Sequence, residues 1–218
     1  MIFEVFIITA IPLLFLLIFL QREQRMLIYF LLWGLTAAIM SYYTYQFLDF
    51  SGIWIPQKEV TIAPFIEEFF KALPLIILFI FTGKKFEKFI LPLAMASGIG
   101  FSILENYLYI MGADYTGLST IMFAVTRAMT TSVMHGCTTA VIGYGFFLIK
   151  DLERQALTPL LIGLYTTAVT IHAIFNILVV YSNTGKVIGV ILPIALFIVL
   201  VLLFYKDELS STDASIVD

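Results

Sequence analysis

Long apolar stretches separated by short polar segments dominate the chain. Seven stretches come close to or exceed the roughly 17–25 residues that a membrane-spanning helix needs, and they cover residues 2–20, 26–49, 61–82, 89–111, 118–149, 157–182 and 186–205. Apolar residues run continuously in these stretches instead of alternating with polar ones, which favours helices over the strands of a membrane barrel. The pattern therefore predicts an all-α, polytopic transmembrane bundle of about seven spans.

The polar segments between these stretches are too short to fold as separate soluble domains. We therefore expect one transmembrane domain over residues 1–205. Residues 206–218 are polar and predict a disordered tail. The stretch 118–149 is too long for one upright span, so we expect it to be tilted, or broken near residues 134–136.

Composition supports a lipid environment. Hydrophobic residues make up 61% of the chain and charged residues 12%, whereas an average soluble domain carries roughly 25% charged residues. The formal net charge is −3, and no basic patch indicates a nucleic-acid partner. The lipid bilayer is the expected surrounding, and nucleic-acid binding is set aside.

Basic residues are distributed unevenly between the two sides of the predicted bundle. Lys58 and Lys186 are the cations on one side, whereas the other side holds Arg22, Arg25, Lys84, Lys85, Lys88, Lys150, Arg154 and Lys206. Because cytoplasmic loops are enriched in Lys and Arg, this distribution predicts an N-terminus outside and a C-terminus, with its tail, in the cytoplasm.

Charged residues and histidines concentrate in the four central stretches, and the other three stretches carry only Glu4, Asp49 and Lys186, each near an end. An ionised side chain at mid-helix costs roughly 2.5–3.5 kcal/mol on insertion, so such residues face the protein interior or a water-filled cavity. At 1.5 Å per residue, the carboxylates and one histidine lie about 9–15 Å from the outer face. The residues are Glu67, Glu68, Lys71, Glu105, Arg127, His135 and His172.

Carboxylates and imidazoles at a shared depth suit the activation of water. Glu67 or Glu68 can act as a general base, and the other can orient the water. His172 and Asn176 are spaced i,i+4 and can donate hydrogen bonds to a developing oxyanion. This chemistry hydrolyses a peptide bond without a Ser or Cys nucleophile.

Zinc offers a second route to the same reaction. Glu105, His135 and His172 are residue types that bind zinc, and Glu67 or Glu68 would remain as the base. No segment has the H-E-x-x-H form, so this ligand set rests on residue type alone. Zinc is therefore a candidate cofactor, and the metal-free alternative stays open.

Four motifs occur in order along the central stretches. EExxK begins at Glu67, FxxxEN begins at Phe101, His135 follows, and HxxxN begins at His172. In this order the chain resembles the PrsW family of bacterial intramembrane proteases, which is related to the CAAX prenyl endopeptidases and the Abi membrane proteins. The resemblance covers about residues 61–182.

The resemblance implies an intramembrane protease, of glutamic or metallopeptidase type, in the bacterial plasma membrane. Its substrate would be a single-span membrane protein, cleaved near the outer face as in the first (site-1) cleavage of a membrane-anchored anti-sigma factor. The catalytic residues would be Glu67, Glu68, Glu105, His135, His172 and Asn176. Lys71, Asn106 and Arg127 are expected to support them.

Two other functions use similar residues. A proton-coupled transporter also places carboxylates and histidines inside the membrane, although the internal repeats of many transporters are not visible here. A non-enzymatic immunity or interaction protein of the CAAX/Abi type could retain the site without cleaving a substrate. Flux without proteolysis would favour the transporter, and an unchanged phenotype in a Glu68→Gln variant would favour the interaction protein.

Overall fold

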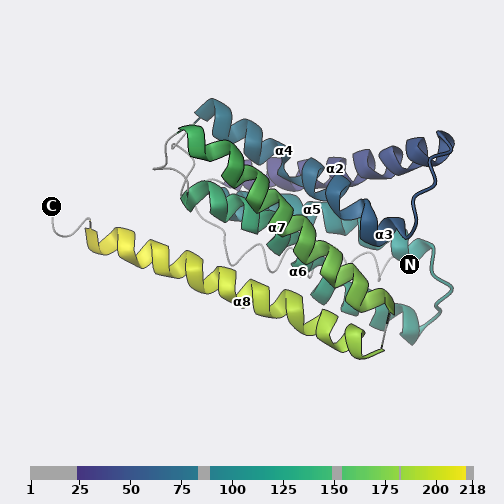
Figure 1. Cartoon of the computed structure of the whole chain (residues 1–218). Coiled ribbons are helices and arrows are strands. Elements are labelled where there is room, and N and C mark those ends of the chain that lie inside the picture. The colour runs from purple at the N-terminus through teal and green to yellow at the C-terminus, as the bar shows by residue number, and fades with distance from the viewer. Residues whose placement is uncertain (1–23, 83–88, 149–153, 182, 215–218) are drawn as a thin grey trace.

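The computed structural model describes residues 24–82, 89–148, 154–181 and 183–214, and these residues form helices and no strand (Figure 1). Six long helices coincide with six of the predicted stretches. The first predicted span, residues 2–20, lies outside the described residues. The helices are α2 (Gln24–Phe50), α3 (Lys58–Thr61), α4 (Ala63–Thr82), α5 (Ile90–Met111), α6 (Leu118–Leu148), α7 (Arg154–Tyr181) and α8 (Asn183–Ala214).

The predicted all-α membrane bundle is confirmed at the level of fold class. In the described part of the chain, three helices are long and apolar enough to cross a membrane: Arg25–Phe50, Thr158–Tyr181 and Thr184–Tyr205. The total number of spans and the orientation of the termini remain predictions.

Two helices continue past positions where the sequence allowed a break or predicted a tail. Helix α6 is continuous over 31 residues, about 46 Å at 1.5 Å per residue, so it is not broken near residues 134–136. Helix α8 continues to Ala214, into the segment predicted as a disordered tail. Residues 206–214 contain neither Gly nor Pro, so no breaker residue ends the helix at the last apolar turn.

Helix α5 occupies the centre of the bundle, where it packs most extensively against α2 and α6. Its side chains from Ile90 to Ser102 are all buried. A Cβ atom on Gly98 would lie 2.1 Å from the carbonyl oxygen of His135, and one on Gly100 would lie 2.1 Å from that of Leu31. Helix α5 therefore packs closely against α6 at Gly98 and against α2 at Gly100.

A proline interrupts the hydrogen bonding of α4 one turn beyond the EExxK motif. Pro74 lies inside the helix and has no N–H to donate to the carbonyl of Phe70. Trp33 of α2 supplies the replacement, because its Nε1 donates to the Phe70 oxygen at 2.8 Å. Ser97 of α5 also donates to the neighbouring carbonyl of Lys71 at 2.8 Å. Helix α4 is therefore tied to two helices beside the site.

Candidate active site

Glu68 is the most heavily hydrogen-bonded carboxylate of the cluster. It is fully buried, and one of its oxygens, Oε1, accepts from three groups. Lys71 Nζ lies at 2.6 Å, Thr138 Oγ1 at 2.8 Å and His172 Nδ1 at 2.8 Å. The other oxygen, Oε2, is buried and has no hydrogen-bond partner within the part of the chain that the structure describes. Helices α4, α6 and α7 therefore meet at one carboxylate oxygen.

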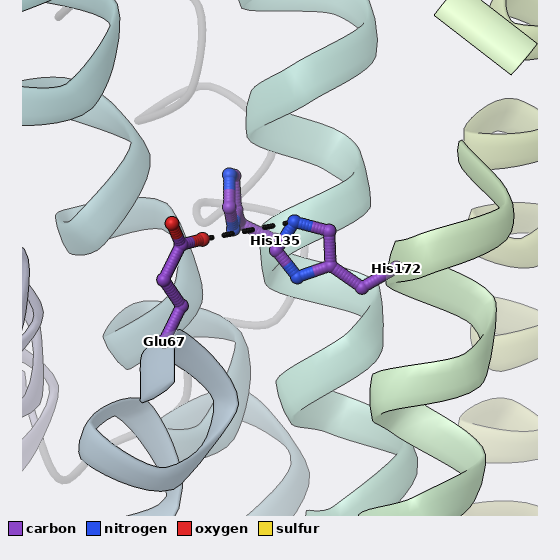
Figure 2. Close-up of side chains that lie close together, drawn as sticks. All are labelled: Glu67, His135 and His172. Carbon is purple, nitrogen blue, oxygen red and sulfur yellow. Dashed lines mark ion pairs between the residues drawn. The ribbon is translucent and has the colours of Figure 1, made fainter. Parts of the chain in front are cut away.

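Glu67 points to a different neighbour, as expected for adjacent residues about 100° apart on a helix. Its Oε1 accepts from the hydroxyl of Tyr45 in α2 at 2.8 Å. Its Oε2 is buried without a partner and lies 3.7 Å from His172 Nε2, beyond hydrogen-bond range. The two atoms face each other across a short gap (Figure 2). An acceptor left unpaired in this way has free capacity for a ligand.

Contacts to the two histidines assign their tautomers. Lys71 Nζ lies 2.9 Å from His135 Nδ1, and an ammonium can only donate, so Nδ1 is the acceptor and Nε2 carries the proton. Nε2 then donates to Glu105 Oε2 at 3.0 Å. For His172, the carboxylate beside Nδ1 requires a proton there, so in the neutral ring Nε2 keeps its lone pair. The two rings pack edge to face, with centroids 4.9 Å apart.

Glu105 belongs to a second hydrogen-bonded network on the Nε2 side of the His135 ring. Its Oε2 also accepts from Arg127 at 3.1 Å. Arg127 Nε donates to Asn106 Oδ1 at 2.7 Å, and Asn106 Nδ2 donates to Ser132 Oγ at 2.9 Å. The guanidinium also lies over the ring of Tyr109, 3.8 Å from its centroid. These contacts hold Arg127 and Asn106 as partners of Glu105.

The structure gives Lys71 and Asn176 partners that the sequence did not specify. Glu67 and Lys71 are spaced i,i+4 and could pair on that ground, but the ion pair among the described residues joins Lys71 to Glu68. Asn176 Nδ2 donates to the backbone carbonyl of Glu59 at 2.6 Å, which links α7 to the segment around α3. The role of Asn176 in stabilising an oxyanion stays a prediction.

The structure gives a different candidate metal set from the expected one. One ligand atom each from Glu67, His135 and His172 lies within 4.8 Å of the others (Figure 2). Glu67 therefore takes the place that the sequence interpretation gave to Glu105, because Glu105 is turned toward Arg127. Two histidines and a carboxylate match the donors of catalytic zinc sites. The unpaired Glu67 Oε2 and the lone pair of His172 Nε2 also fit a metal ion.

Several contacts were not predicted from the sequence. The sequence pattern indicated no site role for Tyr45 or for Thr138. Thr138 lies three residues after His135, so its position on the same helix face could have indicated it. Tyr45 comes from α2, and no local spacing relates it to Glu67.

Comparison with known protein families agrees with this geometry. A family model described as PrsW family intramembrane metalloprotease matches residues 22–204. The chain belongs to this family. Searches of curated proteins and of solved structures found no match. Membership in the PrsW family supports an intramembrane peptidase over a transporter or an immunity protein, and the expected resemblance is confirmed.

Proposed function

We propose that this PrsW family member hydrolyses a peptide bond of a membrane-anchored protein with a water activated at Glu67. The main supporting observation is that Glu67 Oε2 is buried, has no hydrogen-bond partner among the described residues and faces His172 Nε2 at 3.7 Å. Both are acceptors, and a water molecule has two protons to donate. The gap therefore suits a bound water.

The proposed reaction uses Glu67 as the base. It takes one proton from the water while the water oxygen attacks the carbonyl carbon of the substrate. Glu67 then delivers that proton to the leaving nitrogen as the carbon–nitrogen bond breaks. His172 Nε2 holds the second hydrogen of the water and fixes its orientation.

The remaining residues act through these two. Glu68 holds the Nδ1–H of His172 and so keeps the lone pair on Nε2 directed at Glu67. Tyr45 occupies Oε1 of Glu67 and leaves Oε2 for the water. A metal ion, if bound, would be held by Glu67, His135 and His172, and it would supply Lewis-acid activation of a water. Glu68 Oε2 would then remain unliganded.

The substrate class follows from topology and resemblance. With the predicted N-terminus outside, the Glu67 cluster lies in the outer half of the bacterial plasma membrane. A cut at that depth suits a single-span protein, and site-1 cleavage of an anti-sigma-type protein is the proposed physiological reaction. The multi-pass orientation itself rests on the distribution of Lys and Arg.

Reconstitution tests this proposal. The purified protein is placed in liposomes with a panel of single-span reporter proteins, and fragments are identified by mass spectrometry. We expect cleavage by the wild type and its loss in Glu67→Gln. Glu59→Gln is the matched control, because Glu59 is exposed and lies outside the cluster. Cleavage by Glu67→Gln at the wild-type rate would contradict the assignment of the base.

A further inference from the structure

Each imidazole of the cluster is held from behind by a carboxylate. Glu105 accepts from His135 Nε2 at 3.0 Å, and Glu68 accepts from His172 Nδ1 at 2.8 Å. Carboxylates in this position are the usual outer partners of metal-binding histidines, because they fix the tautomer and orient the ring. The nitrogens left for a ligand are therefore His135 Nδ1 and His172 Nε2.

These two nitrogens are in different states. His172 Nε2 faces Glu67 Oε2 at 3.7 Å, and Glu67 Oε2 is buried with no hydrogen-bond partner among the described residues. His135 Nδ1 is already in contact with the ammonium of Lys71 at 2.9 Å. Lys71 is fully buried, and its Nζ also lies 5.2 Å from the centroid of the Phe101 ring. The ammonium of Lys71 thus occupies the position beside His135 Nδ1 where a metal ion would bind.

We propose that Lys71 is a built-in cation that competes with the metal for His135 Nδ1 and thereby sets the metal affinity of the site. This inference rests on the site proposed above and adds a regulator of its metal binding. One lone pair cannot serve both the ammonium and a metal ion. Two cations this close in a buried site also repel each other strongly.

Glu68 gives Lys71 a second partner when it leaves the histidine. The Lys71–Glu68 ion pair is 2.6 Å long and lies within one turn of α4. Lys71 can therefore release His135 while it stays paired with Glu68. Lys71 therefore keeps Glu68 as its counterion in both the metal-free and the metal-bound site.

Zinc affinity of the purified protein in detergent tests this competition without any substrate. Zn²⁺ is titrated against a chromophoric chelator for the wild type, Lys71→Met and Lys71→Gln. We expect at least a tenfold lower Kd in both variants. Lys58→Met is the matched control, since Lys58 pairs with Asp49 outside the cluster, and its Kd should stay within threefold of wild type. An unchanged or higher Kd in the Lys71 variants would overturn the proposal.

A measurement on the unmodified protein covers the case in which both Lys71 variants fail to fold. The chain has two histidines, so ¹⁵N-histidine labelling produces NMR signals from only two imidazole rings. Without metal, NMR should show opposite tautomers, with the proton on Nε2 of His135 and on Nδ1 of His172. Zinc should shift His135 Nδ1 and His172 Nε2. Zinc binding that leaves His135 Nδ1 unshifted would contradict the competition.

Failure of this inference is distinguishable from failure of the proposed function. Cleavage lost in Glu67→Gln together with unchanged zinc affinity in Lys71→Met would retain the peptidase site and reject the competition. Tighter zinc binding in Lys71→Met with no cleavage of any reporter would support the competition and count against the proposed peptidase.

Discussion

Two polar networks meet at His135, one buried around Glu68 and one partly exposed around Glu105, and they differ in their hydrogen bonding. On one side, Glu105, Arg127, Asn106 and Ser132 form a continuous chain of hydrogen bonds. On the other side, Glu67 and Glu68 each keep one buried oxygen without a partner. Buried polar groups are normally satisfied, so the unpaired oxygens indicate a place for a ligand, and the paired network indicates a support.

The largest expected effect comes from removing the charge of Glu68. Glu68→Gln leaves the buried ammonium of Lys71 without its counterion, and breaking a buried ion pair from one side costs about 3–5 kcal/mol. We expect a clear fall in stability, measured by thermal unfolding in detergent, together with at least about 100-fold slower cleavage.

The double variant Glu68→Gln/Lys71→Met separates these two effects. Removing both charges should restore most of the lost stability, because no uncompensated charge remains buried. Cleavage should stay slow. A double variant as unstable as Glu68→Gln would show that the ion pair is not the source of the stability.

The next effect tests the helix contact that carries His135. Gly98→Ala brings a Cβ atom to 2.1 Å from the His135 carbonyl oxygen, so α5 and α6 must move apart. Overpacking of this kind costs about 1–3 kcal/mol, and displacement of His135 should also slow cleavage. Thermal unfolding and reporter cleavage measure the two losses.

Gly163→Ala is the control for that change. Nothing lies within 4 Å of a Cβ at Gly163, and the residue lies within helix α7. Because Ala is a better helix former than Gly by about 1 kcal/mol, stability should stay equal or rise. A loss similar to that of Gly98→Ala would show that close packing at Gly98 is not the cause.

A change inside the paired network should affect stability more than catalysis. Arg127→Met removes the partner of Glu105, whose side chain is 20% exposed. Because water can partly solvate this carboxylate, we expect the free energy of unfolding to fall by only about 1–3 kcal/mol. Cleavage should fall less than tenfold, because Glu67 and His172 keep their contacts. Cleavage lost as completely as in Glu67→Gln would place Arg127 in the catalytic machinery instead.

The smallest expected effect is at the end of the same network. Ser132→Ala removes one acceptor for Asn106, and a single hydrogen bond contributes about 1 kcal/mol. We expect a small fall in the unfolding temperature and no change in cleavage rate. A large fall in cleavage would mean that this network contributes to catalysis as well as to stability.

The long helices were predictable because a continuous apolar run is a local property. Helix α5 was expected over residues 89–111 and is found at Ile90–Met111. The four-residue helix α3 was predicted as part of a loop, since its segment has no apolar period. The first predicted span lies outside the described residues, so its prediction stands untested.

The site was predictable as a set of residues, and its pairing was not. Motif order and depth predicted that Glu67, Glu68 and His172 lie close together, and the structure places His172 beside both carboxylates. Spacing along one helix suggested the wrong partner for Lys71, because the i,i+3 and i,i+4 positions are both within reach. Glu67 replaces Glu105 in the candidate metal set because Glu105 pairs with Arg127, and Arg127 lies on another helix.

A side-by-side measurement of Glu67→Gln and Arg127→Met tests the comparison most directly. Both variants are assayed for reporter cleavage in liposomes and for thermal unfolding. We predict that Glu67→Gln loses cleavage by about 10²–10⁴-fold with no fall in unfolding temperature, while Arg127→Met loses stability and keeps most cleavage. Wild-type cleavage by Glu67→Gln, or equal losses of cleavage in both variants, would contradict the division into a catalytic and a supporting network.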